Sequence, residues 1–338
     1  MRSRLRVQRT GALSRVLGAL TALVVVTALG GCSGGSAQPS SAGRATDKPG
    51  GTFVIDRDFP DPDVMKSGGT YYAYATNTAS VNVQQATSVD LASWKVSPTD
   101  ALPHLPGWAS KGNTWAPDVS ELSPGHFIMY FVARDTKLGL QCIGVATSTS
   151  PSGPFTSNAS APITCHAAEG GAIDPSTFVD TDGARYLVWK NDGNCCGFDT
   201  YIQISRLSGD GLSLVGSTTK LFKQTEAWEG TLIEAPTLVK HGGNYVLFYS
   251  ANDYGGYSYA IGYAHSTSLL GPYTKRNGPF LSSQQTNGLY IGPGGQDVVA
   301  GPDGRDRLIF HSWDPAIVYR GVNTLPLKWK NDLPVLEL

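Results

Sequence analysis

Residues 230–250 read GTLIEAPTLVKHGGNYVLFYS: an acidic residue and a proline, a short apolar segment, a Gly-Gly turn and an aromatic-rich segment. The proline and the glycines bound the two apolar segments, as is typical of β-strands. The Gly-Gly pair supplies the positive φ angles that a tight hairpin requires. The stretch therefore predicts an antiparallel hairpin whose first strand begins beside a carboxylate, Glu234.

The same pattern occurs five times along the chain. The copies are Pro60–Asn77, Ala116–Ala133, Asp174–Lys190, Ala235–Ser250 and Gly295–Trp313. Counted from Tyr71 through Phe127, Tyr186 and Tyr245 to Leu308, successive copies lie 56, 59, 59 and 63 residues apart. A β-sandwich would not predict one hairpin at nearly constant spacing. We therefore expect an all-β fold, a five-bladed β-propeller over residues 52–338, in which Thr52–Asp56 could close the ring by pairing with the last blade.

The first 32 residues predict a secretory signal. Five arginines without an acidic residue precede the apolar run Val16–Leu29, which small residues and Cys32 follow. This run is shorter than the roughly 20 residues that a membrane-spanning helix needs. Cys32 resembles the cysteine of a bacterial lipobox, which implies cleavage before it and a lipid on its thiol. Residues 33–51 are rich in Gly, Ser, Ala and Pro and predict a flexible linker, so we expect an extracellular lipoprotein that meets the membrane only through its anchor.

Charge and composition narrow the class of ligand. Without the leader the chain has 21 basic and 27 acidic residues, a net charge of −6, which argues against a nucleic-acid partner. Few charges with abundant Gly, Tyr and Trp suit a neutral, hydroxyl-rich ligand that stacks on aromatic rings.

Four cysteines beyond the leader predict two disulfides in an exported protein. They are Cys142, Cys165, Cys195 and Cys196. Three pairings are open, and we favour Cys142–Cys165 with Cys195–Cys196 because adjacent cysteines rarely reach two separate partners. A metal site is the weaker alternative, since no CxxC or His-x-x-His spacing accompanies them.

The first strand of each propeller blade lines the central channel, so residues at its start converge. Asp61, Asp174 and Glu234 stand there in the first, third and fourth repeats. Asp-Pro is an ordinary turn dipeptide, but three acids at equivalent positions favour a site. Crowding raises the pKa of at least one of them, as a general acid requires. We assign that role to Glu234 because its sequence neighbours are apolar.

Four motifs resemble glycoside hydrolase family 43, with the resemblance running from Asp58 to Leu338. They are PDPDV at Pro60, WAPDV at Trp115, IDPSTFVDTDGARYLVW at Ile173 and IEAPTLVKHGGNYVLFYS at Ile233. The resemblance implies a five-bladed propeller and inverting hydrolysis of arabinose- or xylose-containing plant polysaccharides. It implies that Asp61 is the general base, Asp174 the modulator of pKa and Glu234 the general acid. Inversion places two such carboxyl groups roughly 6.5–9.5 Å apart, with a water between base and sugar.

Several further residues are candidates for binding. Those for the sugar are Phe59, Asn113, Trp115, Trp228 and Arg320. Trp115 could stack on the sugar or pack within its blade, and Arg320 would match an arginine that approaches the sugar in some members. His311 would match a histidine that holds a central calcium ion, directly or through water, in relatives; a buried histidine without a ligand is the alternative. Many relatives have a histidine near the position of Gly295, and its absence here leaves open whether an ion binds. The hydrolysis itself needs no cofactor.

We therefore expect a secreted, monomeric hydrolase of the α-L-arabinofuranosidase or arabinanase type. Its partner would be a plant cell-wall polysaccharide or oligosaccharide. The chain ends at Leu338, which fits members with a single propeller. A β-xylosidase or exo-galactanase on the same scaffold, a non-catalytic carbohydrate-binding propeller and a retaining fructan hydrolase are the alternatives.

Overall fold

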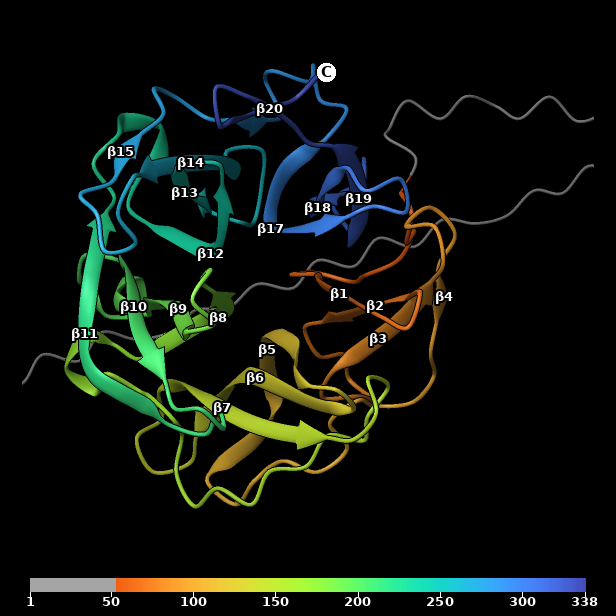
Figure 1. Ribbon diagram of the computed structural model, residues 1–338, viewed down its shortest axis with the longest axis vertical. Coiled ribbons are helices and arrows are strands. Elements are labelled where there is room, and N and C mark those ends of the chain that lie inside the picture. Colours follow the sequence, from red (N-terminus) through yellow and green to blue (C-terminus); the bar gives the residue numbers. More distant parts are fainter. Residues whose placement is uncertain (1–52) are drawn as a thin grey trace, which may run out of the picture. The chain divides into compact units, whose positions relative to one another are not determined.

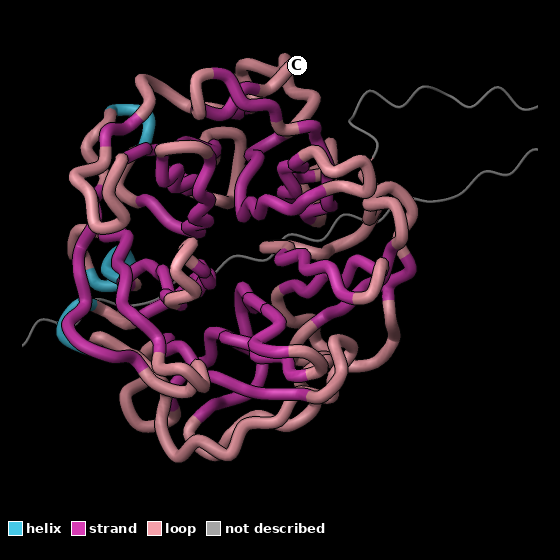
Figure 2. Tube along the Cα trace, viewed as in Figure 1, coloured by secondary structure: helices cyan, strands magenta, loops and turns pink. Residues whose placement is uncertain are grey.

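Residues 53–338, which the computed structural model describes, form five antiparallel β-sheets around a common axis (Figure 1). Strands and loops make up almost all of this part, with three short 3-10 turns (Figure 2). The predicted all-β, five-bladed propeller is confirmed. The predicted signal peptide, Cys32 and linker lie outside the described residues. No helix within residues 53–338 has the length and apolar character to cross a membrane.

The strands of each blade lie in sequence order, except that β16 pairs with β14. The first blade contains β1 (Asp63–Ser67), β2 (Thr70–Ala75), β3 (Gln84–Ser88) and β4 (Lys95–Val96), and the second β5 (Ala109–Ser123), β6 (His126–Asp135) and β7 (Gln141–Ser148). The third contains β8 (Ala172–Val179), β9 (Arg185–Asn191), β10 (Tyr201–Leu207) and β11 (Leu214–Lys223). The fourth contains β12 (Ile233–His241), β13 (Asn244–Ala251), β14 (Ala260–Ser266), β15 (Thr274–Lys275) and β16 (Leu281–Ser282). The fifth contains β17 (Ile291–Ala300), β18 (Asp306–Trp313) and β19 (Arg320–Pro326), and β20 (Lys328–Lys330) and β21 (Leu333–Val335) form a separate hairpin.

The ring closes through its innermost strands and through the start of the described chain. Strands β1, β5, β8, β12 and β17 contact one another in order, and β17 contacts β1. Ile55 pairs with Val322 of β19, with backbone hydrogen bonds from Val54 N to Val322 O (2.8 Å) and from Val322 N to Ile55 O (3.0 Å). The predicted closure by the segment before the first blade is thus confirmed for its described residues.

Five apolar clusters fill the five interfaces between neighbouring blades. Tyr74 of β2 packs with Phe131 of β6, for example, and Trp189 of β9 packs with Tyr130 of β6. Corresponding clusters join the third and fourth, fourth and fifth, and fifth and first blades. Each blade therefore buries both of its faces, and the hydrophobic effect holds the sheets in a closed ring.

One backbone position at the start of each inner strand has a left-handed conformation. The residues and φ values are Asp61 (55°), Ala116 (39°), Asp174 (55°), Ala235 (50°) and Gly295 (54°). A proline follows each of the first four. Left-handed backbone is uncommon for residues other than glycine, so its recurrence identifies the equivalent position of the five blades. That position in the fourth blade is Ala235, and the prediction that Glu234 occupies it is wrong by one residue.

A ring of carboxylates joins neighbouring blades further along the inner strands. Asp297 Oδ2 accepts a hydrogen bond from Val64 N (2.8 Å) and Asp63 Oδ2 accepts one from Val119 N (2.9 Å). Asp118 Oδ2 likewise accepts one from Thr177 N (2.9 Å). Burial raises the pKa of all three carboxyls, that of Asp118 to about 7 and that of Asp297 to about 6.

Replacing Asp118 with asparagine is expected to stabilise the protein at alkaline pH. A folded-state pKa of about 7, against an ordinary value of 3.8, means that Asp118 lowers the stability progressively as the pH rises between these values. The pKa is raised by about three units, each unit corresponds to about 1.4 kcal/mol, and roughly 2–4 °C of Tm accompanies each kcal/mol, so Asp118→Asn should gain on the order of 10 °C at pH 8. Calorimetry at pH 5 and pH 8 measures the effect, with the exposed Asp182→Asn as control. The prediction would be contradicted if Tm changed by the same amount between pH 5 and pH 8 in the wild type and in Asp118→Asn.

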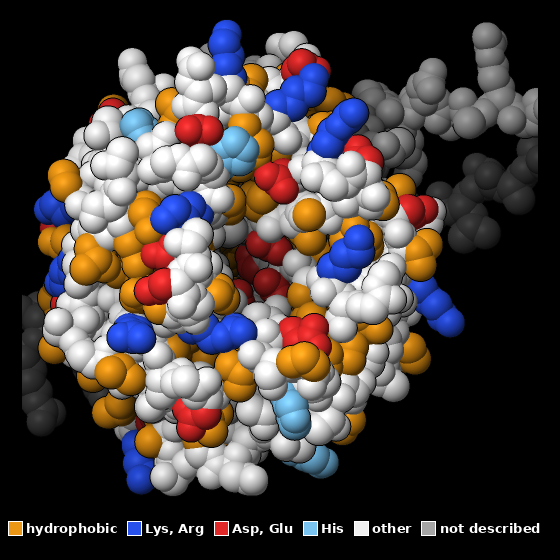
Figure 3. Space-filling model, viewed as in Figure 1, with side chains coloured by type: hydrophobic (Ala, Val, Ile, Leu, Met, Phe, Trp, Pro, Cys, Tyr) orange, Lys and Arg blue, Asp and Glu red, His pale blue; other side chains and the backbone are white. Residues whose placement is uncertain are grey.

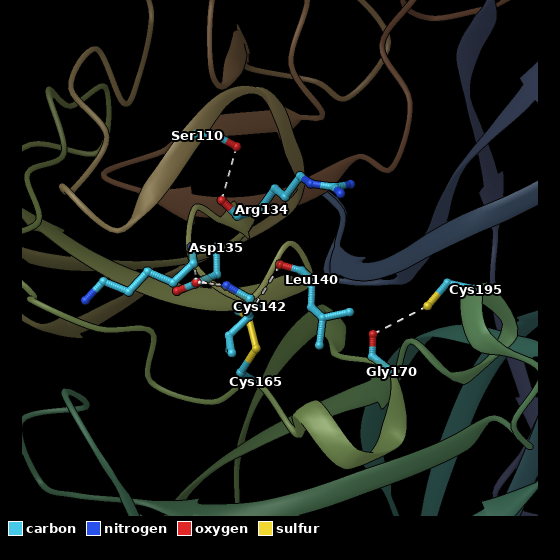
Figure 4. Close-up of a disulfide and its surroundings, with 10 residues drawn as sticks. Ser110, Arg134, Asp135, Leu140, Cys142, Cys165, Gly170 and Cys195 are labelled. Atoms are coloured by element: carbon cyan, nitrogen blue, oxygen red, sulfur yellow. Dashed lines mark hydrogen bonds between the residues drawn. A yellow bond between two sulfur atoms is a disulfide. The ribbon is translucent and has the colours of Figure 1, made fainter.

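Both favoured disulfides are present. Cys142 of β7 is joined to Cys165, which lies on the connection to the third blade, and Cys195 is joined to Cys196. Figure 4 shows the first bond and places Cys195 beside Gly170, whose carbonyl oxygen is 3.5 Å from the sulfur. The Cys195–Cys196 pair lies in the 3-10 turn Gly193–Cys196, on the loop between β9 and β10. The pairings predicted from the sequence are confirmed.

Candidate active site

The acids predicted from the sequence gather at one end of the axis, where the inner strands begin. Asp61 lies two residues before β1, Asp174 lies near the start of β8, and Glu234 is the second residue of β12. Figure 3 shows acidic side chains at the bottom of a hollow in the centre of the face drawn. A cavity of about 50 Å³ on the axis is lined by Asp61 and Asp174 but not by Glu234. Only two of the three predicted acids therefore line this cavity.

Tyr259 shows that Glu234 is nevertheless close to the other two acids. Burial, followed by the charges of Glu234, Asp61 and Asp174, raises the pKa of the Tyr259 hydroxyl well above its usual value. The charges of all three carboxylates therefore act on one buried phenol, whose hydroxyl group donates to Glu234 Oε1 (2.8 Å).

Asp61 is held as an ionised carboxylate. Thr76 Oγ1 donates a hydrogen bond to its Oδ2 (2.7 Å), and Arg320 Nη1 lies 3.6 Å from its Oδ1. Burial acts to raise the pKa of Asp61, but Arg320, His311 and the Thr76 hydrogen bond outweigh it, so the pKa lies below 3.8. Burial holds the pKa of His311 at about 3, so Arg320 is the cation that acts on Asp61 near neutral pH. This carboxylate is suited to accept a proton.

Asp174 is the acid with the raised pKa. Its Oδ2 accepts a hydrogen bond from Ala235 N (2.9 Å), the residue after Glu234. Burial and then the charge of Glu234 raise the pKa of Asp174 to about 8, with Asp61 adding to the effect and Lys190 opposing it. The predicted crowding effect is therefore present, and it falls on Asp174, which is neutral below that pH.

Glu234 lies among polar groups rather than in the apolar surroundings that its sequence neighbours suggested. Tyr259 OH donates to its Oε1 (2.8 Å) and Lys190 Nζ donates to its Oε2 (3.1 Å). Side chains alternate along a strand, so buried Ile233 faces away from the position that Glu234 occupies. That prediction was wrong because neighbours in sequence do not share a face.

Two stacked rings connect Glu234 to Asp61. The Tyr259 ring stacks on the His311 ring with centroids 5.9 Å apart and planes 8° from parallel. His311 Nδ1 in turn accepts a hydrogen bond from Asp61 N (3.0 Å). The rings therefore lie between an acid that contacts Tyr259 and an acid whose backbone contacts His311. Such an arrangement keeps two carboxyl groups apart, as inversion requires.

The predicted sugar-contacting residues do not all lie in comparable places. Phe59 is fully buried in the cluster between the fifth and first blades, so it cannot line a pocket wall as predicted. Asn113 and Trp115 are half-buried on β5, and Trp115 packs against the cluster between the second and third blades. Trp228 stacks on Tyr249 with centroids 5.9 Å apart. These packing contacts fix the positions of the two tryptophans and leave their sugar contacts as predictions.

Arg320 lies against two aromatic rings on the same side as Asp61. Its guanidinium carbon is 5.1 Å from the centroid of Tyr254 and 5.7 Å from that of Trp313. Trp313 Nε1 donates to the backbone carbonyl oxygen of Tyr254 (2.7 Å), which ties the Trp313 ring to the loop that carries Tyr254. The aromatic contacts orient the arginine that keeps Asp61 ionised.

The side chains of residues 53–338 do not by themselves form a calcium site. Because His311 Nδ1 accepts the Asp61 N–H, its ring proton lies on Nε2, and a protonated nitrogen cannot bind a cation. Within residues 53–338 no group of three or more His, Cys, Asp or Glu side chains is placed to hold a metal ion. A Cβ atom at Gly295 would come within 2.6 Å of His311, which accounts for the glycine there. The central ion stays a prediction, and no step below depends on it.

Comparison with known proteins agrees with this geometry. A family model described as "Glycosyl hydrolases family 43" matches residues 52–334. Extracellular endo-alpha-(1->5)-L-arabinanase 1 of Bacillus subtilis is 27% identical over 270 residues, which is 75% of this chain and 80% of the relative. A solved thermostable family-43 glycoside hydrolase is similar with a TM-score of 0.74 and 30% identity, covering 86% of this chain and 95% of its own. An endo-1,4-beta-xylanase from Bacteroides thetaiotaomicron is similar with a TM-score of 0.73 and 30% identity, covering 85% and 96%.

Proposed function

The chain belongs to glycosyl hydrolase family 43, and from that premise we propose that it releases arabinose or arabino-oligosaccharides from plant polysaccharides, as an α-L-arabinofuranosidase or arabinanase. The observation that carries the assignment of the base is the ionised state of Asp61, which lies beside the neutral carboxyl group of Asp174. The pKa of Asp61 lies below 3.8, whereas burial and the charge of Glu234 raise that of Asp174 to about 8. Neighbouring acids whose pKa values are pushed apart are typical of acid–base sites. Here the contrast identifies the base, and the role of Glu234 as the acid rests on the match of its motif to the family.

In the proposed mechanism Asp61 takes a proton from a water molecule, whose oxygen attacks the anomeric carbon of the sugar. Glu234 donates a proton to the leaving oxygen as the glycosidic bond breaks. A single displacement inverts the anomeric configuration. Asp174, neutral below about pH 8, binds the backbone beside Glu234 and limits the repulsion among the three acids. We expect activity to fall on the acid side as Asp61 is protonated below pH 3.8, and on the alkaline side as Asp174 ionises near pH 8.

Support for arabinose comes from the Bacillus arabinanase, which covers most of both chains, and from the Glu-Ala-Pro form of the motif at Glu234. The similar xylanase structure supports the alternative of a β-xylosidase. In both cases the substrate would be a neutral polysaccharide, and the half-buried Trp115 and Trp228 would contact its sugar rings.

A panel of polysaccharides tests the substrate. We expect release of arabinose or short arabino-oligosaccharides from linear arabinan or arabinoxylan, with at least tenfold lower rates on xylo-oligosaccharides and galactan. Product sizing by chromatography separates exo from endo action. Faster hydrolysis of xylo-oligosaccharides than of any arabinose-containing substrate would replace the arabinose assignment with the xylosidase alternative. Binding without turnover on all four would indicate a carbohydrate-binding propeller.

We further propose that the protein acts outside the cell. The Bacillus relative is named as extracellular, and two disulfides are typical of exported proteins. The arginine-rich leader and Cys32 are consistent with a lipid anchor at the cell surface.

A further inference from the structure

Lys190 is a fully buried lysine at the end of β9 that the mechanism above does not use. Burying an ammonium group is strongly unfavourable unless its charge is paired and its N–H groups are hydrogen-bonded. Lys190 Nζ donates to Asn194 Oδ1 (2.6 Å) and to Glu234 Oε2 (3.1 Å), and Asp192 Oδ1 lies 3.8 Å away. The ammonium therefore connects the loop between β9 and β10 to the carboxylate of the fourth blade.

The backbone around Lys190 is firmly held. In the register of the third blade, Lys190 lies opposite Ile173 of β8 on one side and Ile202 of β10 on the other. Ile173 immediately precedes Asp174, so the lysine stands beside two of the three acids. Trp189, its neighbour in the strand, is fully buried in the cluster with the second blade. Because β9 is a central strand packed in this way, the backbone that carries the Lys190 side chain is held in place.

We propose that Lys190 is a positioning residue for Glu234 and that Asn194 holds its ammonium in place. Glu234 receives one hydrogen bond on each oxygen, from Lys190 of the third blade and from Tyr259 of the fourth, so its plane is fixed from two sides. A charged lysine has donors and no acceptor, so it orients the carboxyl group without competing for the proton that Glu234 delivers. The inference rests on the proposed role of Glu234 as the general acid.

The charge of Lys190 also acts on the neighbouring acids. Burial raises the pKa of Asp174 to about 8, with Glu234 and Asp61 adding to the rise, and Lys190 opposes it. Burial likewise raises the pKa of Asp192, again opposed by Lys190. Removing the lysine should therefore raise the pKa of Asp174 further and move the alkaline limit of activity to higher pH. Lys190→Arg, which keeps the charge, should leave that limit in place.

The choice of leaving group separates a positioning role from a structural one. A 2,4-dinitrophenolate leaves without protonation, whereas a phenolate or a sugar needs the acid. Displacement of a catalytic group by about 1 Å can cost on the order of 100-fold, so Lys190→Met should lower kcat about 100-fold on a phenyl glycoside. On the 2,4-dinitrophenyl glycoside of the same sugar the loss should stay below about fivefold. Asn194→Ala, which removes only the anchor of the ammonium, should show the same pattern with about a tenfold loss on the phenyl glycoside.

Lys275→Met is the matched control. Lys275 is a half-buried lysine, and its Nζ lies 2.7 Å from Glu229, a fully buried glutamate in the 3-10 turn Ala227–Glu229 before β12. Its loss should lower Tm without any dependence on the leaving group. Lys190→Met removes a buried charge and could fail to fold. Asn194→Ala then tests the dependence of the rate on the leaving group in a protein that folds.

Glu234→Gln shows how strongly the rate depends on the leaving group when the general acid itself is lost. Dependence on the leaving group in Glu234→Gln, Lys190→Met and Asn194→Ala together supports the inference. The inference is overturned if only Glu234→Gln depends on the leaving group and the Lys190 and Asn194 variants lose equally on both glycosides. The proposed mechanism would still stand in that case. No such dependence in Glu234→Gln would overturn both.

Discussion

Asp61→Asn is expected to lower kcat by about 10²–10⁴-fold on every substrate, whatever its leaving group, because activation of the water is needed in each case. Asparagine has nearly the same shape, and its amide oxygen can still accept the hydrogen bond from Thr76 that Asp61 Oδ2 accepts (2.7 Å). What it lacks is a group that can take the proton. Steady-state kinetics on the phenyl and 2,4-dinitrophenyl glycosides of one sugar measures the effect.

The control for this variant is Asp182→Asn, a change at an exposed position on the turn between β8 and β9. Its rates should equal those of the wild type. The Tm of Asp61→Asn should be measured alongside, so that a loss of fold is not mistaken for a loss of catalysis. Near-normal rates in Asp61→Asn would mean that the base is another residue.

Glu234→Gln is expected to lower kcat by a similar factor of about 10²–10⁴ on a phenyl glycoside or an oligosaccharide, because glutamine cannot protonate the leaving oxygen. On the 2,4-dinitrophenyl glycoside the loss should be far smaller. The single carbonyl oxygen of glutamine can accept the hydrogen bond from Tyr259 or the one from Lys190, and the other donor then faces the NH2 group and loses its acceptor.

Glu229→Gln is a closely matched control. Glu229 also receives hydrogen bonds from a tyrosine and a lysine, Tyr249 OH (2.7 Å) and Lys275 Nζ (2.7 Å), and it is fully buried. Its replacement should lower Tm and leave the ratio of rates on the two glycosides unchanged. An equal loss on both glycosides in Glu234→Gln would contradict the assignment of Glu234 as the acid.

The fold was predictable because each blade repeats one local unit. The Gly-Gly and Asp-Gly turns and the apolar segments around them depend on neighbours in sequence, and their spacing of about sixty residues revealed the number of blades. The outermost strands were harder to place. Strands β4, β15 and β16 have two residues each, which is too short for an alternating pattern to appear.

The site was predictable only where the repeat itself places a side chain. Asp61 and Asp174 stand at the left-handed position before a proline, and a comparison of the repeats finds them. Lys190 and Tyr259 reach Glu234 from 44 and 25 residues away in sequence, so no local pattern reports their contacts. For Lys190 the sequence did contain one signal, because a lysine ends the otherwise apolar run YLVWK. Phe59 was misplaced because closeness to Asp61 in sequence does not determine which way a side chain points.

The most direct test of the account is the configuration of the sugar as it is first released. Proton NMR during hydrolysis, recorded before mutarotation, distinguishes the two anomers. A single displacement by water, with Asp61 as base and Glu234 as acid, predicts that the first-formed sugar has the anomeric configuration opposite to that of the substrate. A first-formed sugar with the configuration of the substrate would require a covalent intermediate and would contradict the proposed mechanism.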